Sequence, residues 1–211
     1  MACFVAGTAP CAAELRDRAI ALDLGFSAKR QTCGLASTDK PEGELCCFAE
    51  AVKRVGHFCS VEQTAAPAAL IIEAPLSCFF DDDEVGNPVH REFELQGCET
   101  RYWYVGAGAT TCLAAVFFLR KLRQRLSASK AVITVFEGFG TFKKSRTSHA
   151  EDAKELLDKF LRGSVIAVEV PETVQAVSVL YLADCGTVSA LPAVVGVEKN
   201  AGKNAVHSPY F

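Results

Sequence analysis

The sequence predicts a single α/β domain in which helices cover both faces of a mixed central sheet. Apolar strand-like runs alternate with helical patterns along most of the chain, which is typical of layered α/β folds. Near the N-terminus two strand-like runs follow each other across a short polar loop, which indicates an antiparallel hairpin in the same sheet. The chain has 211 residues, of which 50% are hydrophobic, enough for one sizeable core.

The strands of the first half are short apolar runs bounded by turn-forming residues. Residues 19–23 (AIALD) and 31–37 (QTCGLAS) form the hairpin, and the polar segment GFSAKR joins them. Residues 44–66 contain a third strand followed by a helix, whose boundary the pattern does not resolve. Residues 68–77 (AALIIEAPLS) form a strand of apolar and β-branched residues that ends at Pro75.

The second half continues the alternation after a long polar segment, residues 79–109, which we expect to form a functional loop over one end of the sheet. The remaining elements, in chain order, are a helix over 110–127 with a threonine cap, a strand over 130–142, a helix over 148–161, a strand over 164–170 and an apolar segment from 172 that begins as a helix. Ser148 and Glu151 form a capping box at the start of the 148–161 helix. The apolar face expected of the 110–127 helix consists of Leu113, Val116, Phe117, Leu119, Leu122 and Leu126.

The two ends of the chain carry weaker patterns. Residues 1–18 are expected to be a loose or strand-like leader, residues 19–198 the domain and residues 199–211 a tail. The leader lacks the basic n-region of a signal peptide, and no apolar run is long enough to span a membrane. Ten scattered cysteines without a C-x-x-C pair indicate reduced thiols and argue against a zinc site. We therefore expect a cytoplasmic protein with no membrane partner.

The overall charge argues against a general nucleic-acid coat, because the net charge is −3 and the pI is near 5.8. A local basic face is compatible with these values, and Lys143, Lys144 and Arg146 are candidate nucleic-acid contacts. The basic residues at 120–125 are better explained as the solvent side of an amphipathic helix.

Carboxylates end three of the predicted strands: Asp23, Glu73 and Glu137. His149 and Asp152 lie three residues apart near the start of the following helix, so they share one face of it. Several acids at one end of neighbouring strands would repel each other, and a divalent cation relieves that repulsion. Oxygen ligands suit Mg²⁺ or Mn²⁺. The sequence therefore predicts a shared metal site at this edge of the sheet.

The order of these elements resembles the ribonuclease H-like superfamily over residues 19–160: strand with Asp, hairpin, third strand, helix, strand with Glu, helix, strand, and helix with a His-x-x-Asp pair. The stretch ALDLGFSAKRQTCGLA is similar to the first hairpin of the Holliday-junction resolvase branch. IIEAPLS resembles the acid of the fourth strand in a branch of predicted ribonuclease H-like nucleases, and SHAEDA resembles the C-terminal helix that supplies the last ligand.

The resemblance implies phosphodiester hydrolysis by a two-metal mechanism. Asp23 would bridge both cations, Glu73 would bind one and Asp152 the other, while His149 orders the attacking water or shuttles a proton. Glu137 has no firm counterpart and would line the site at most. Asp184 is a rival to Asp152, because the closing acid falls late in the chain in the predicted-nuclease branch. The expected partner is nucleic acid, either DNA or RNA, and a homodimer is compatible with the sequence.

Two details of the 79–109 segment allow two interpretations each. Residues 81–83, all aspartates, are either a second cation site or, more simply, a solvated acidic tip. Arg91 and Arg101 either hold a phosphate or pair with glutamates of the same segment, which are Glu92, Glu94 and Glu99.

Three other functions compete with a nuclease. A non-catalytic ribonuclease H-like binding module would keep the fold without the chemistry. An actin-like or sugar-kinase-type protein would use DLGFS and ADCGT as phosphate loops, but that fold needs two such halves and 211 residues are too few. Gly106 and Gly108 are a weak sign of a dinucleotide turn, better explained as a helix start. The histidines and cysteines show no arrangement typical of nucleophilic hydrolysis.

Overall fold

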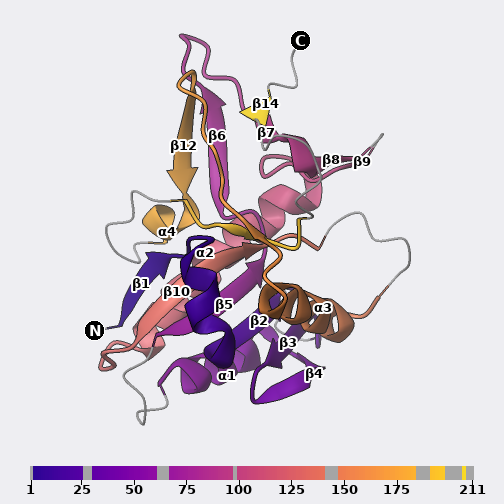
Figure 1. Ribbon diagram of the computed structural model, residues 1–211, viewed down its shortest axis with the longest axis vertical. Helices are drawn as coiled ribbons and strands as arrows, with labels where there is room; N and C mark the ends of the chain where they lie inside the picture. The colour runs from indigo at the N-terminus through magenta and orange to yellow at the C-terminus, as the bar shows by residue number, and fades with distance from the viewer. Residues whose placement is uncertain are drawn as a thin grey trace.

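A mixed sheet of parallel and antiparallel strands organises the fold, which confirms the α/β class (Figure 1). The computed structural model describes residues 2–25, 30–60, 67–96, 99–140, 147–183, 191–197 and 206–207. Within these residues the central sheet has eight strands, in the order β11-β13-β10-β5-β2-β3-β4, and β1 also pairs with β10. Its strands are β1 (Cys3–Ala6), β2 (Ala19–Asp23), β3 (Cys33–Ser37), β4 (Lys40–Cys46), β5 (Ala68–Glu73), β10 (Val132–Gly138), β11 (Val165–Ile166) and β13 (Val194–Val195).

The two strands at the centre of the sheet are apolar at every interior position because helices cover both of its faces. β2 and β5 run parallel, with Ala19 paired to Ala69 and Asp23 paired to Glu73. Side chains alternate between the faces, so the two sides of each strand enter different hydrophobic clusters. The antiparallel hairpin expected near the N-terminus is β2–β3, and β4 extends it.

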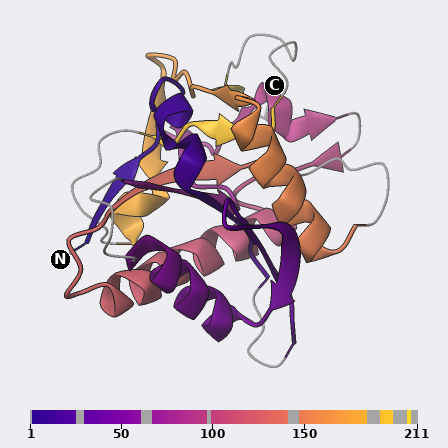
Figure 2. The ribbon, with the colours of Figure 1, turned by 60° about the horizontal axis from the view of Figure 1, so that its bottom comes forward.

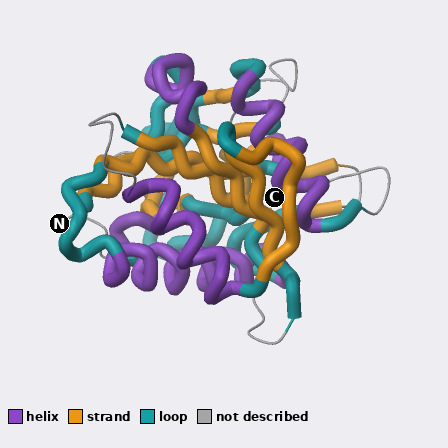
Figure 3. Tube along the Cα trace, turned by 90° about the horizontal axis from the view of Figure 1, so that it is seen from below, coloured by secondary structure: helices purple, strands orange, loops and turns teal. Residues whose placement is uncertain are grey.

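The helices form one layer on each face of the sheet (Figures 2 and 3). α1 (Phe48–Ser60) and α2 (Gly106–Arg125) pack together on one face. α3 (His149–Leu161) and the 3₁₀ helix η1 (Cys11–Arg18) cover the other. None of the helices in the described part of the chain combines the length and the apolar character needed to cross a bilayer.

The N-terminal segment contributes to the sheet, which therefore begins before the boundary expected at residue 19. β1 pairs in parallel with β10, from Cys3 opposite Val132 to Ala6 opposite Val135. Phe4 is almost completely buried in the core next to this pairing. The strand was hard to recognise because it is only four residues long and too short to show a period.

The sequence placed the start of α2 incorrectly and predicted its buried face only in part. The helix begins at Gly106, four residues before the expected threonine cap, and Leu113 is 71% exposed. Leu119, Leu122 and Leu126 are buried as expected, but the rest of the buried side consists of smaller residues, among them Cys112, Ala114 and Ala115. Large side chains dominated the sequence pattern, whereas small residues fill much of the first half of the packed face.

The segment expected to be a long loop instead contains strands that form an arm beyond the sheet (Figure 1). β6 (Ser77–Asp81) pairs antiparallel with β12 (Val174–Ser178), in the region expected to begin as a helix. Among the described residues of that region, only α4 (Val179–Leu182) is helical. The alternation in β12 is too short to be decisive, and its partner lies far away in the chain. The shorter elements of this region are β7 (His90–Arg91), η2 (Glu92–Glu94), β8 (Leu95–Gln96), β9 (Glu99–Thr100) and β14 (Val206–His207).

Candidate metal centre

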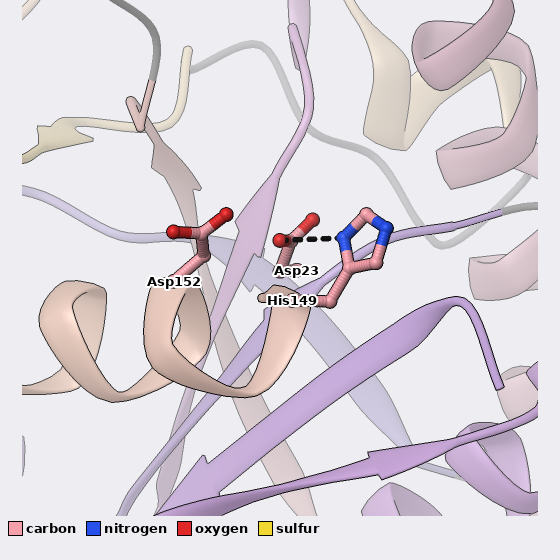
Figure 4. Close-up of side chains that lie close together, drawn as sticks. All are labelled: Asp23, His149 and Asp152. Atoms are coloured by element: carbon pink, nitrogen blue, oxygen red, sulfur yellow. Dashed lines mark hydrogen bonds and ion pairs between the residues drawn. The ribbon is translucent and has the colours of Figure 1, made fainter. Parts of the chain in front are cut away.

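Three potential metal ligands meet where the last residue of β2 faces the first turn of α3 (Figure 4). Asp23, His149 and Asp152 each offer one ligand atom, and these atoms lie within 4.8 Å of one another. Nδ1 of His149 lies 2.8 Å from Oδ2 of Asp23 and donates a hydrogen bond to it. We call these three residues the candidate metal centre.

The capping box of α3 fixes the position of His149 and Asp152. The hydroxyl of Ser148 accepts a hydrogen bond from the backbone N–H of Glu151 at 3.3 Å, and the Glu151 carboxylate accepts from the Ser148 N–H at 2.7 Å. The helix therefore begins at His149, as the sequence predicted, and its second ligand follows three residues later on the same face. This register turns both side chains toward the end of β2 (Figure 4).

Two glycines allow α3 to approach the sheet closely enough for this contact. Gly34 in β3 is paired with Asp23, and a Cβ built on it would lie 1.7 Å from the carbonyl oxygen of His149. Gly43 in β4 has a φ of 70°, and a Cβ there would lie 2.3 Å from the carbonyl oxygen of Ala150. Any larger residue at Gly34 must push the helix away. The sequence analysis did not single out Gly34, because only the structure shows what it contacts.

Burial of the two carboxylates, Asp23 and Asp152, costs free energy unless they have hydrogen-bond or ionic partners. Asp23 is 5% exposed and Asp152 is 8% exposed, whereas the side chain of His149 is 45% exposed. The hydroxyl of Thr147 donates a hydrogen bond to Oδ1 of Asp152. Two acids at this spacing repel each other, and a cation between them or a protonated imidazole offsets the repulsion. The centre is thus a pair of buried carboxylates, and solvent reaches it past the imidazole of His149.

A neighbouring cysteine does not add a thiolate ligand in this structure. The thiol of Cys33 donates a hydrogen bond to the carbonyl oxygen of Gly25 at 2.9 Å. Burial raises the pKa of Cys33 to about 11, and the charge of Asp23 adds to the increase. The group is therefore a neutral thiol at physiological pH, which leaves the donor set with two carboxylates and one imidazole.

Glu73 lies beside the centre without being one of its three members. It ends β5 directly opposite Asp23, and neighbouring strands are about 4.8 Å apart. The alternation of β5 puts it on the α3 face, where it is half-buried. Of the ligands predicted from the sequence, the structure thus brings Asp23 and Asp152 together, joined by His149, which was expected to shuttle protons. Glu73 as a ligand stays a prediction.

Glu137 belongs to a separate buried ion network. Its carboxylate accepts hydrogen bonds from Arg91 at 2.6 and 3.1 Å and from the backbone N–H of Leu76 at 3.0 Å, and Arg101 lies 3.4 Å away. In β10 it pairs with Ile72, whose side chain faces α1 and α2 rather than α3. Glu137 is therefore turned away from the candidate metal centre and does not line it.

Arg91 and Arg101, in the segment expected to be a loop, pair with glutamates. This favours the ion-pair interpretation over phosphate binding. Arg91 is completely buried between the rings of Phe79 and Phe93, and it also binds Glu94 at 2.6 Å. Burial alone would lower the pKa of Arg91, but the charges of Glu137 and Glu94 outweigh it and raise that pKa. Glu94 was among the expected partners, whereas Glu137 was not, because it comes from a distant strand.

The aspartates at 81–83 shape a turn. Oδ1 of Asp83 accepts from the backbone N–H groups of Val85 and Gly86 at 3.0 and 2.7 Å, and Asp82 accepts from Gln175 at 2.7 Å. They do not belong to a group of metal ligands among the described residues, which favours the acidic tip. The rival ligand and the basic candidates lie outside the described residues: Asp184, Lys143, Lys144 and Arg146.

Comparison of the chain with models of protein families, with curated proteins and with solved structures finds no match. The functional argument therefore depends on the arrangement of the elements and on the chemistry of the three residues at the end of β2.

Proposed function

We propose that the protein is a divalent-cation-dependent nuclease of the ribonuclease H-like type, which hydrolyses phosphodiester bonds of nucleic acid. The convergence of Asp23, His149 and Asp152 carries this proposal. The order of elements supports it, because β2, β3, β4, α1, β5, α2, β10 and α3 follow each other as the resemblance expects. Small strands of the arm interrupt this order only between β5 and α2.

The donor set fits a divalent cation. Two carboxylates supply the hard oxygen ligands that Mg²⁺ and Mn²⁺ prefer, and an imidazole is a better ligand for Mn²⁺ than for Mg²⁺. We therefore infer that Mn²⁺ binds more tightly than Mg²⁺. A bound cation would supply an acidified water and neutralise charge on the phosphate.

Each residue of the centre has its own task in this proposal. Without a cation, Asp23 holds the imidazole through Nδ1 (Figure 4). With a cation bound, His149 would exchange this hydrogen bond for a bond to the metal and Asp23 would supply the first carboxylate. Asp152, held by Thr147, supplies the second carboxylate.

In a two-metal mechanism, Glu73 would supply the further carboxylate that a second cation needs. Three ligand atoms within 4.8 Å define one cation site, and a second site needs a further carboxylate next to Asp23. Glu73 is in register with Asp23 on the neighbouring parallel strand, and we propose that its side chain turns toward Asp23 when a second cation binds. We also propose that Lys143, Lys144 and Arg146, which precede α3 in the sequence, contact the phosphate backbone of the substrate.

The experiment is cleavage of a labelled panel of branched DNA, hairpin RNA and RNA–DNA hybrid in Mn²⁺. We expect the wild type to cut at least one substrate and Asp23→Asn to cut none. Asp158→Asn is the matched control, because it removes the same charge from α3 two turns beyond the centre. Loss of cutting in the control as well, or equal cutting by Asp23→Asn, would contradict the assigned role of Asp23.

One observation favours a second function, in which Asp23 and His149 act as an acid–base dyad without a metal. Their 2.8 Å hydrogen bond already has the geometry by which a carboxylate orients a general base. EDTA separates the two functions, since it abolishes cutting by a metal nuclease and leaves a dyad active. Binding of nucleic acid without cutting under both conditions would indicate a non-catalytic binding module.

A further inference from the structure

A pocket of about 320 Å³ lies between α1 and the β3–β4 hairpin, away from the candidate metal centre. Its apolar lining includes Ile20, Leu35 and Phe58. The size and the mixture of apolar walls with a few polar groups are typical of sites for small molecules. Residues of its rim are charged: Asp39, Lys40, Glu44, Lys53, Arg54 and His57.

The pocket and the metal centre occupy opposite ends and opposite faces of the same strands. Ile20 lies near the start of β2 and is paired with Ser37, whereas Asp23 ends the strand and is paired with Gly34. Ile20 faces the α1 side, and the metal centre faces α3. A ligand in this pocket therefore does not reach Asp23 or His149, and the inference does not depend on the proposed nuclease.

The charges of the rim leave a net positive face. Glu44 forms ion pairs with both Lys40 and Arg54, and the hydrogen bond from Lys40 is the largest cause that lowers its pKa. Lys53 and His57 lie one turn apart on α1, so their exposed side chains share a face. Neither has an ion pair with any described residue, and Asp39 is the one rim acid outside the Glu44 cluster.

We propose that this pocket binds a small amphiphilic anion, with a phosphate or carboxylate head on an aromatic body. Lys53 and His57 bind the head, because they are adjacent donors on one face of α1 and neither forms an ion pair with a described residue. The aromatic body lies against Ile20, Leu35 and Phe58, because these apolar side chains line the pocket. The pocket accommodates both parts of the ligand, since its lining combines apolar side chains with charged ones.

Binding to the full chain is tested by calorimetry and by NMR shift mapping with phenyl phosphate, benzoate, inorganic phosphate and benzyl alcohol. We expect phenyl phosphate or benzoate to bind and to shift resonances of α1 and β3, and the tighter of the two identifies the head group. Equal affinity for inorganic phosphate would overturn the role of the apolar lining. Equal affinity for benzyl alcohol would overturn the role of the cations.

Variants of the two donors identify the site. Lys53→Gln combined with His57→Gln weakens binding about tenfold or more, as the loss of charge-assisted hydrogen bonds predicts. Both positions are exposed, so the fold tolerates the change, and Lys130→Gln removes an exposed lysine elsewhere as the control. Asp23→Asn leaves this binding unchanged whether or not the nuclease proposal is correct. Unchanged binding by the double variant, or no binding of either aromatic anion, overturns the proposal.

Discussion

Oδ2 of Asp23, at the end of β2, accepts a hydrogen bond of 2.8 Å from Nδ1 of His149, the first residue of α3. The two residues are 126 positions apart in the chain. Their contact exists because a capping box fixes where α3 begins and a glycine lets the helix touch β3. Each of these causes leads to a separate prediction.

Replacing Gly34 with alanine is expected to destabilise the protein by about 2 kcal/mol or more, because the new Cβ would overlap the His149 carbonyl oxygen. Gly86→Ala is the control, since its Cβ meets nothing within 4 Å and only its φ of 64° carries a cost of about 1 kcal/mol. Urea unfolding measures both variants. A smaller loss of stability in Gly34→Ala than in Gly86→Ala would show that α3 does not press on β3.

Removing the helix cap is expected to weaken both the fold and the site. Ser148→Ala loses the hydrogen bonds that fix the first turn of α3 and lowers the free energy of unfolding by about 1 kcal/mol. Mn²⁺ affinity falls with it, because His149 and Asp152 are in that turn. Ser127→Ala, in an exposed turn, should leave both quantities unchanged. An unaltered Mn²⁺ affinity in Ser148→Ala would show that the helix cap does not position the metal ligands.

The buried ion network has a structural role that can be tested independently. Arg91→Met leaves Glu94 and Glu137 buried without their main cation, which costs about 3–5 kcal/mol. Replacing both acids with glutamine in the same protein should recover much of this loss, because neutral amides need no counter-charge. Thermal unfolding compares these variants with Arg120→Met, which removes an exposed arginine. Similar stability of Arg91→Met and Arg120→Met would show that the network contributes little.

The sequence predicted those features of the fold that depend on local composition. β2 and β5 were recognisable because a strand covered on both faces is a continuous apolar run, and α3 because its capping box marks its first residue. The convergence of Asp23, His149 and Asp152 followed from the positions of the strand end and the helix start. Each of these signals is local, because it lies within a few residues of the strand end or helix start that it marks.

The errors concern features that depend on distant partners. β12 was mistaken for a helix because β6, which it pairs with, is almost a hundred positions away and gives no local sign. Glu137 was placed near the metal site because a strand-end acid does not reveal which face it takes. Its true neighbour, Arg91, comes from a segment expected to be a loop. Pairings of this kind are determined by packing, and no local pattern encodes them.

The central claim is that Asp23, His149 and Asp152 form a cation site, and titration of the protein with Mn²⁺ by calorimetry tests it most directly. We predict that the wild type and Asp158→Asn bind Mn²⁺ alike, and that Asp23→Asn binds at least about tenfold more weakly, since it loses a ligand. Mg²⁺ should compete for the same site. Absence of Mn²⁺ binding by the wild type, or equal affinity in Asp23→Asn, would contradict the claim and leave the three residues as a structural contact between β2 and α3.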